Sequence, residues 1–365
     1  MASDPIPAPP CCFHTRAVIS ILTITNQKLI TLKKISIAAL IAATAACAAN
    51  TASAQGTERI ATLTVENDLF VGEDNGYTNG TYFSWAHGGL SEFNDENLPD
   101  WIHAISRNLY ISTMSGKRRG VSYLVGQAMQ TPADITQPEL IEDDVPYVGL
   151  LLWQGSLHAY DDHLADKLSL AWGIAGPAAG AKHTQTTLHQ WVGADEPMGW
   201  GHQINNELAF RVGAERLWRI VRFTLAEQTG FDMIGIGSAG VGTLKSNVAA
   251  GLSFRFGYGL DRSFPTATVL PGREINPLAG SVAHSWSLFF NVLGEYVAND
   301  ISIDGNTFSD SHAVKLEHWQ NQFVAGLAFN WERWAFLLSN VKASERHEQQ
   351  IEPGDFGSLS VTYHF

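Results

Sequence analysis

The residues best suited to chemistry near the start of the sequence are Asn67, Asp68 and Thr78. Asp68 ends a segment in which polar residues recur on one face, and Thr78 opens a second such segment. Two adjacent strands would bring the three side chains together at one rim. Their carboxylate, amide and hydroxyl oxygens suit a hard cation such as Ca²⁺. The intervening Asp74-Asn75-Gly76 is ordinary turn chemistry, however, and polar residues that merely end a strand are the simpler interpretation.

A second candidate group lies in the segment 176–202, which holds His183, His189 and His202. A neutral imidazole accepts a proton near pH 7, which makes histidine the usual general base. Asp195, six residues after His189, could orient that ring or add an oxygen ligand to a metal. The histidine spacing matches neither H-x-x-x-H nor H-E-x-x-H, so a zinc motif is not indicated. An ordinary loop histidine is the commoner case.

The composition restricts the class of protein that must position these groups. The chain of 365 residues is 45% hydrophobic and only 16% charged, yet its mean hydropathy is −0.04. After residue 55 there is no apolar run of about 20 residues, which argues against a helical membrane protein. The formal net charge of −13 argues against nucleic acid as a partner, because such binding depends on Lys and Arg.

The first 54 residues have the features of an export signal. Three lysines between residues 28 and 34 precede the apolar stretch Ile35–Cys47, and Ala52-Ser53-Ala54 follows it. This order predicts a secretory signal peptide that is cleaved after the last of these alanines during Sec export. The stretch before residue 28 is too long for such a signal, so we expect initiation near Leu29 or a functionless extension. The predicted division is 1–54, extension and signal peptide, and 55–365, mature protein.

The cysteines support export and exclude two kinds of site. All three, Cys11, Cys12 and Cys47, lie in the leader, so the predicted mature chain has none. A large exported domain can fold without disulfides, whereas a small one usually needs them. Zinc thiolate sites and cysteine nucleophiles are therefore not expected in the mature protein.

The final segment, 358–365, alternates strictly between two kinds of residue. Leu359, Val361, Tyr363 and Phe365 share one face, and Ser, Thr and His residues occupy the other. This repeat is typical of a transmembrane β-strand with its apolar face toward lipid. A terminal Phe365 resembles the signal by which bacterial outer-membrane proteins engage the barrel assembly machinery. A soluble sandwich strand could alternate too, but we favour the barrel.

Other segments repeat the pattern less regularly. They predict an all-β protein, a transmembrane antiparallel up-and-down barrel of about twelve strands, because bacterial single-chain barrels have even strand numbers. The predicted strands are Glu58–Asp68, Thr78–Gly88, Gly120–Gln130, Tyr147–His158, Leu168–Ile174, Asn205–Glu215, Arg219–Gly235, Ala249–Gly259, Ser287–Val297, Gln322–Trp331, Trp334–Lys342 and Gly357–Phe365.

The connections between these strands predict which end of the barrel faces outward. Long polar segments are expected to be extracellular loops: Leu90–Gly116, Pro132–Val145, Gly176–His202, Leu260–His284 and Asn299–Glu317. Asn330–Arg333 and Ala165–Lys167 are expected to be periplasmic turns. Tryptophans near strand ends would form an interfacial girdle: Trp85, Trp153, Trp218, Trp331 and Trp334.

Several blocks taken together resemble one family, the lipid A 3′-O-deacylases. Each block is weak alone, but they are distributed along essentially the whole mature chain. They are Thr62–Asp68, Gly76–Gly80, Gly126–Pro132, Asp143–Gly149 and His189–Asp195. The resemblance implies a twelve-stranded outer-membrane barrel that uses Ca²⁺ to hydrolyse the ester-linked 3′ acyloxyacyl group of lipid A in lipopolysaccharide.

The resemblance also implies roles for particular residues. The family's Asn-Asp pair at the end of the first strand matches Asn67 and Asp68, its Thr at the start of the second strand matches Thr78, and its essential histidine matches His189. These four would be catalytic, with Asn67, Asp68 and Asp195 as metal ligands and Asp195 also orienting substrate or base. Asp195 stands where the family has Glu, which keeps the charge but shortens the reach.

One departure from the family concerns the loop after the third strand. The family has a lysine there, whereas Pro132–Val145 contains neither Lys nor Arg. This puts contact with phosphate or an oxyanion in doubt, and it leaves open a changed substrate or an inactive family member. The alternatives are an outer-membrane phospholipase and a non-catalytic barrel or porin. In every case we expect a monomer embedded in outer-membrane lipid.

Overall fold

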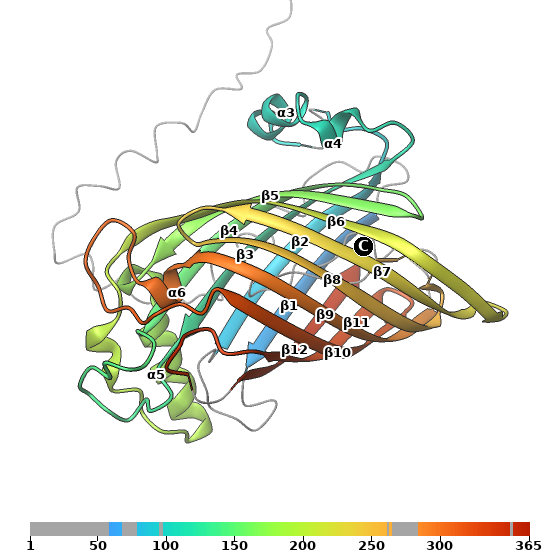
Figure 1. Ribbon diagram of the computed structural model, residues 1–365. Coiled ribbons are helices and arrows are strands. Elements are labelled where there is room, and N and C mark those ends of the chain that lie inside the picture. Colours follow the sequence, from blue (N-terminus) through green and yellow to red (C-terminus); the bar gives the residue numbers. More distant parts are fainter. Residues whose placement is uncertain (1–57, 68–78, 95–97, 261–262, 265–283, 351–352) are drawn as a thin grey trace, which may run out of the picture. The chain divides into compact units, whose positions relative to one another are not determined.

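The computed structural model describes residues 58–67, 79–94, 98–260, 263–264, 284–350 and 353–365. The described residues form twelve antiparallel strands in sequence order, and β1 pairs with β12 to close the barrel (Figure 1). The strands are β1 (Glu58–Asn67), β2 (Asn79–Leu90), β3 (Arg118–Gln130), β4 (Val148–Tyr160), β5 (Leu164–Ala175), β6 (Glu207–Ala226), β7 (Thr229–Val241), β8 (Lys245–Tyr258), β9 (His284–Asp300), β10 (Trp319–Trp331), β11 (Trp334–Ala343) and β12 (Gly354–His364).

The predicted barrel and its closure by the last strand are therefore confirmed. Inside the barrel, the hydroxyl groups of Thr62 on β1 and Thr362 on β12 form a hydrogen bond of 2.5 Å, and those of Thr64 and Ser360 form one of 2.8 Å. Within the part of the chain that the structure describes, no helix is long and apolar enough to cross a bilayer.

Alternation along the strands separates an apolar outer face from a polar lumen. On β6, Leu208, Phe210 and Val212 are exposed on the outside, whereas Arg211 between them is buried in the lumen. Such a sheet satisfies every backbone group through its neighbours and leaves no free edge. The sequence pattern thus leads directly to a wall that is compatible with lipid.

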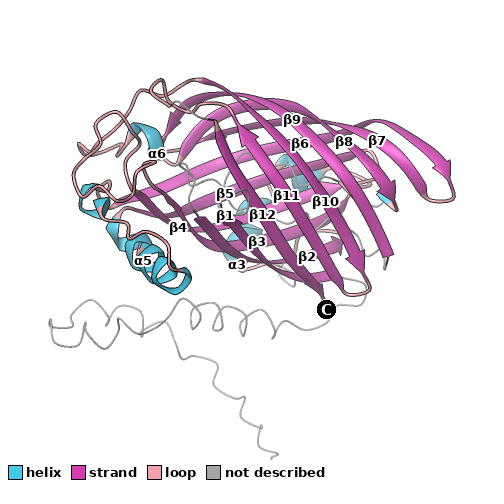
Figure 2. Cartoon of the chain, turned by 90° about the horizontal axis from the view of Figure 1, so that it is seen from below, coloured by secondary structure: helices cyan, strands magenta, loops and turns pink. Residues whose placement is uncertain are grey.

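The two ends of the barrel differ in what closes them. We call the end at which the chain enters β1 and leaves β12 the terminus end, and the opposite end the loop end. The loop end carries η3 (Pro177–Ala179), α5 (Ala181–Val192), η4 (Gly199–His202) and α6 (Ile301–Asp304), and Figure 2 shows α5 and α6 together there. Helices α3 (Asp100–Ser106) and α4 (Tyr110–Thr113) lie in the connection between β2 and β3, at the terminus end.

Three details of the predicted connections were wrong. The connections after β2 and after β8 begin and end at the terminus end, because successive strands alternate direction, so they do not start from the same end as the other three predicted loops. Residues 165–167 lie within β5. The turn precedes them, where Asp161 Oδ1 accepts hydrogen bonds at 2.8 Å from the backbone of His163 and of Leu164.

The sixth and seventh strands were also divided at the wrong place. No break occurs at residues 216–218, and β6 continues to Ala226. The chain reverses at Glu227, a non-glycine residue with a φ of 48°. Residues other than glycine rarely adopt this left-handed conformation, so the residue type at position 227 gave no signal for the turn.

The lumen at the terminus end is filled by the barrel's own residues. Arg255 donates to Asp232 Oδ1 at 2.9 Å, and Arg219 donates to the Ser263 carbonyl at 2.7 Å. The neighbouring Phe264 is buried against Ile234 and against the guanidinium of Arg219, which lies 4.8 Å from the ring centroid. The start of the β8–β9 connection is thereby held inside the barrel.

Candidate active site

The predicted site begins at the loop end of β1. Asn67 is the last residue of β1, opposite Asn79 on β2 and Gly357 on β12. Asp68 and Thr78 lie outside the described residues, in the connection between β1 and β2. The structure therefore places Asn67 at the predicted rim and leaves the positions of its two partners as predictions.

The segment that carries His189 is helical rather than a loop. Helix α5 covers Ala181–Val192, and Gly193 ends it in a left-handed conformation with a φ of 73°. The backbone N–H groups of Gly193 and Ala194 donate to the His189 carbonyl at 2.8 and 3.0 Å. Glycine at this position favours such a helix end, because it lacks the Cβ that would clash.

The reversal after α5 brings Asp195 back against His189. The Nδ1 atom of His189 lies 2.6 Å from the backbone carbonyl oxygen of Asp195. A carbonyl can only accept, so Nδ1 is the donor in this contact, and in the neutral ring Nε2 is then the nitrogen with the lone pair. The orienting group is the main chain of Asp195 rather than its carboxylate. This tautomer is the one that a general base requires.

Helix α5 is anchored by a buried side-chain pair that the sequence did not reveal. Trp200 in η4 donates from Nε1 to Gln185 Oε1 at 2.7 Å, and both side chains are almost completely buried. Gln185 lies one helical turn before His189, so the two share a face of α5. A helical prediction for 181–192 would have placed Gln185 and His189 on one face by their spacing of four, but it would not have identified Trp200 as the partner of Gln185.

The base of α5 also packs onto the barrel wall. Ala181 shares a buried cluster with Met129 on β3, with Tyr147 and with Trp200. Gly149 at the start of β4 allows this approach, because a Cβ there would lie 2.6 Å from that of Ala181. Met129 in turn pairs with Asn79, the partner of Asn67. The first hairpin and α5 are thus joined through β3 at the loop end.

Cationic groups reach this end from connections other than the one after β3. Arg346, between β11 and β12, donates to Gln130 Oε1 at 2.8 Å, where β3 ends. It also donates to Ser302 Oγ at 2.7 Å and lies 3.3 Å from Asp300 Oδ2. The loop Pro132–Val145 indeed carries no cation, but the neighbouring space holds one. Nothing in the sequence pointed to this arginine near β3, because 216 residues separate Arg346 from Gln130.

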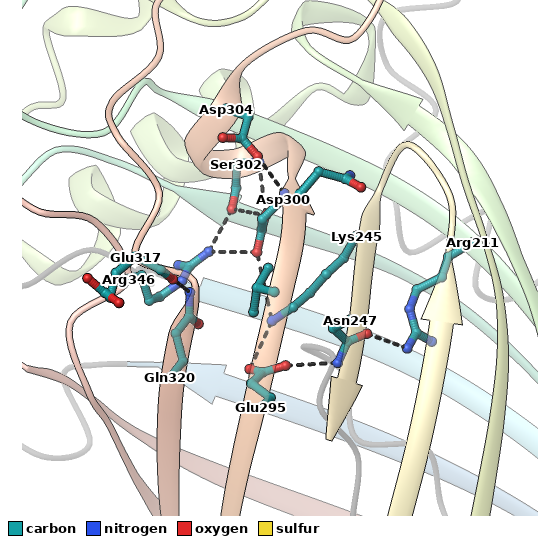
Figure 3. A network of polar contacts seen from close by, with 12 residues as sticks. Arg211, Lys245, Asn247, Glu295, Asp300, Ser302, Asp304, Glu317, Gln320 and Arg346 are labelled. Carbon is teal, nitrogen blue, oxygen red and sulfur yellow. Dashed lines mark hydrogen bonds and ion pairs between the residues drawn. The ribbon is translucent and has the colours of Figure 1, made fainter. Parts of the chain in front are cut away.

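The same network continues down the lumen wall (Figure 3). Lys245 Nζ lies 3.0 Å from Glu295 Oε1, and Asn247 donates to the other oxygen of Glu295 at 2.8 Å. Arg211 donates to Asn247 Oδ1 at 2.8 Å. Buried charges are tolerated only when they are paired, and here the pairs fix α6 and its neighbours in the loop-end mouth.

The predicted metal ligands share one kind of donor chemistry. Asn67 and Asp195 offer amide and carboxylate oxygens, which fit Ca²⁺, and Asp68 would add a carboxylate. In the ranges that the structure describes, no three His, Cys, Asp or Glu side chains gather closely enough to hold a metal ion. A site of this composition would therefore need Asp68, which lies outside those ranges.

Comparison with known families decides which group of proteins this barrel belongs to. The family model described as outer membrane protein LpxR matches residues 35–365. The chain belongs to this family. The resemblance found in the sequence blocks is thereby confirmed, and the chain is a member of a family of integral outer-membrane proteins. A comparison with curated proteins gives no match.

A solved structure from the same family has the same fold. LpxR from Salmonella typhimurium is similar with a TM-score of 0.69 and 16% identity, covering 84% of this chain and 100% of that one. The β domain of the Bordetella autotransporter BrkA has a TM-score of 0.40 at 12% identity, covering 86% of this chain and 100% of that one. The NalP translocator domain from Neisseria meningitidis has 0.40 at 9%, covering 93% and 100%.

Proposed function

We propose that this chain hydrolyses the ester-linked 3′ acyloxyacyl group of lipid A in a calcium-dependent reaction at the outer leaflet of the outer membrane. Membership of the LpxR family supports the substrate class. The observation that carries the chemistry is the contact between His189 Nδ1 and the Asp195 carbonyl, which leaves Nε2 able to accept a proton.

The steps assigned to the protein's own residues are few. His189 Nε2 would take a proton from a water molecule as that water attacks the acyl carbonyl, and would later return it to the departing sugar oxygen. Asn67, Asp68 and Thr78 would bind and orient the ester at the rim, with Asp195 beside the base. The anchored α5 keeps the imidazole in place, which lowers the entropic cost of the reaction.

Asn67, Asp68 and Asp195 would together hold Ca²⁺. The chemistry that this ion supplies when bound is polarisation of the ester carbonyl and stabilisation of the developing oxyanion. No serine nucleophile is needed for this route, because the attacking group is water.

The filled lumen weighs against a porin. Twelve strands enclose a narrow interior, and here Arg255, Asp232 and Phe264 occupy it at the terminus end. At the loop end, Lys245 and Glu295 and the residues around α6 occupy it as well. An outer-membrane phospholipase remains the second candidate for the reaction itself, since it would also cleave an ester near this rim.

The test is mass spectrometry of lipid A after incubation with the purified full-length protein in detergent, once with added calcium and once with EDTA. We expect a calcium-dependent loss of mass equal to the 3′ acyloxyacyl group, together with release of that fatty acid. Folding is checked by the heat-modifiable mobility of the barrel on gels. A folded protein that leaves lipid A intact but releases fatty acid from phospholipid would replace this proposal by the phospholipase.

A further inference from the structure

We propose that the connection between β2 and β3, with helices α3 and α4, is a membrane-surface element. It would lie on the outer wall of β3 and β4 and insert Trp101 and Ile105 among the phospholipids of the leaflet at the terminus end. This inference does not depend on the proposed reaction, because it concerns the opposite end of the barrel (Figure 1).

The segment packs on the outside of the barrel rather than in its lumen. On β3 and β4 the lumen-facing residues include Ser122 and His158, whose side chains meet at 2.9 Å. Val121 and Leu157 alternate with them and therefore face outward. Ile111 of α4, which is completely buried, belongs to the same apolar cluster as these two residues. The wall is thus covered here by protein where lipid would otherwise lie.

Helix α3 has an apolar strip, Trp101 and Ile105, that the barrel does not cover. An α-helix turns about 100° per residue, so Trp101 and Ile105 lie only about 40° apart. Both are exposed, at 51% and 58%, whereas Ser106 on the barrel side is buried. Arg107, directly after α3, points about 160° away from Ile105 and is exposed as well. The segment therefore has a buried side, an exposed apolar side and an exposed polar side.

The exposed apolar side continues the lipid-facing surface of the barrel. The Trp101 ring lies 6.1 Å from that of Trp153 on β4, and Trp153 lies 6.0 Å from Trp172 on β5. Trp172 is 49% exposed on the outer wall, beside the exposed Leu170 on the same strand. Trp101 thus extends a row of outward aromatic rings beyond the strands themselves. Tryptophan favours the boundary between headgroups and acyl chains.

The covered wall contains a charge that lipid could not accommodate. Arg119 on β3 is outward by alternation yet only 5% exposed. Its guanidinium donates to the carbonyls of Lys117, at 2.7 Å, and of Met114, at the end of the connection itself. An arginine facing acyl chains is destabilising, so the connection shields this residue while its own apolar side takes over the contact with lipid.

A bilayer is favoured over a protein partner because the strip is continuous with a surface that must contact lipid. Its polar side carries Asp100, His103 and Arg107, a mixed set of charged and polar groups that suits the aqueous side of an interfacial helix. The arrangement matches an interfacial helix, which buries one face at the boundary of headgroups and acyl chains and leaves its charged face in water.

The test uses spin labels in the full-length chain, whose native cysteines, Cys11, Cys12 and Cys47, are replaced by serine. A single nitroxide is attached at Ile105→Cys or, as the matched control two residues away, at Arg107→Cys. The protein is reconstituted into vesicles of phosphatidylethanolamine and phosphatidylglycerol. Collision rates are measured with oxygen, which concentrates in lipid, and with a water-soluble nickel complex.

We expect the ratio of oxygen to nickel collisions to exceed one at residue 105 and to fall below one at residue 107. A nickel-dominated signal at both positions would show that the strip faces water and would overturn the proposal. Exclusion of both reagents at residue 105 would overturn it too, since that result means contact with protein. Heat-modifiable mobility of each labelled barrel shows that the compared samples are folded.

Discussion

Two helical connections, α5 at the loop end and α3–α4 at the terminus end, are built from similar lengths of chain and both expose a tryptophan, Trp191 and Trp101, but they differ in the side chains that they bury and hold in place. Helix α5 buries Gln185 against Trp200 and leaves the imidazole of His189 accessible beside the Asp195 carbonyl. The α3–α4 segment buries Ile111 and leaves aromatic and aliphatic side chains uncovered.

The contrast shows that a barrel wall can support two kinds of insertion. Helix α5 packs its base on β3 and β4 and satisfies buried polar groups through the Gln185–Trp200 pair. A connection that folds back along the wall can leave an apolar side exposed, since lipid covers it. Chemistry on a lipid ester is therefore expected at α5, and attachment to the bilayer at α3–α4.

The largest effect is expected from removing the base. His189→Ala should lower the rate of lipid A deacylation by at least about a hundredfold, because general base catalysis contributes that much or more. The rate is measured as fatty acid released per minute from lipid A with saturating calcium.

His183→Ala is the matched control for this change, since His183 is the second histidine of α5 and lies, exposed, at the opposite end of the helix. It should retain most of the activity. Equal losses in the two variants would mean that α5 acts only as a structural element, and the assignment of His189 would be wrong.

The next effect concerns the anchor of α5. Trp200→Phe keeps an aromatic ring but removes the hydrogen bond to Gln185, which leaves a buried acceptor unsatisfied at a cost of about 1–3 kcal/mol. Hydrogen exchange of the α5 backbone amides should accelerate by about tenfold or more, whereas exchange in α3 should not change. Equal acceleration in both helices would show that the two connections are coupled rather than independent.

A smaller effect is expected at Asp195. Asp195→Asn keeps the backbone carbonyl that holds His189 but removes one charged ligand from the proposed cation site. The calcium concentration for half-maximal activity should rise about tenfold, while activity at saturating calcium is largely retained. Glu196→Gln, the adjacent exposed carboxylate, is the control. A fall in activity that calcium cannot restore would assign the Asp195 carboxylate to the base instead.

The smallest effect is a pH dependence at the loop end. Burial lowers the pKa of His347, although Asp144, at 3.9 Å, partly offsets this. Because the folded pKa lies below the unfolded value of about 6.5, protonation favours opening. The stability that the neutral ring provides is complete above that value and is lost as the pH falls toward the folded pKa.

Residues 344–350 should accordingly open more often at pH 5.5 than at about pH 7.5, once the intrinsic exchange rate is corrected. Hydrogen exchange measures this directly, and His347→Gln should abolish the difference. No change is expected in α3, which contains no buried histidine. A constant opening rate across this range in the wild-type chain would contradict the assignment.

The strands could be predicted because one physical requirement repeats in each of them. Leu359 and Val361 alternate with Ser360 and Thr362 for the same reason that Leu208 and Phe210 alternate with Ala209. Turns lack such repetition. The reversal at Glu227 depends on one residue in a left-handed conformation, and nothing in its neighbours signals it.

The candidate site could be predicted only where it follows from strand ends. Asn67 lies at the rim because β1 ends at this residue. The pairing of Gln185 with Trp200, and of Arg346 with Gln130, depends on contacts between distant segments, which a single sequence does not encode locally. The orientation of His189 by the Asp195 main chain required the helix end at Gly193, within a segment expected to be a loop.

The difference between α5 and α3–α4 is tested most directly by determining on which side of the outer membrane each of these two connections lies. Single cysteines at His183→Cys on α5 and Arg107→Cys beside α3 are introduced into a chain whose native cysteines are replaced by serine. Intact cells are then treated with a maleimide attached to a polymer too large to cross the outer membrane. We expect residue 183 to be labelled in intact cells and residue 107 only after the membrane is permeabilised. Labelling of residue 107 in intact cells, with residue 183 protected, would contradict it.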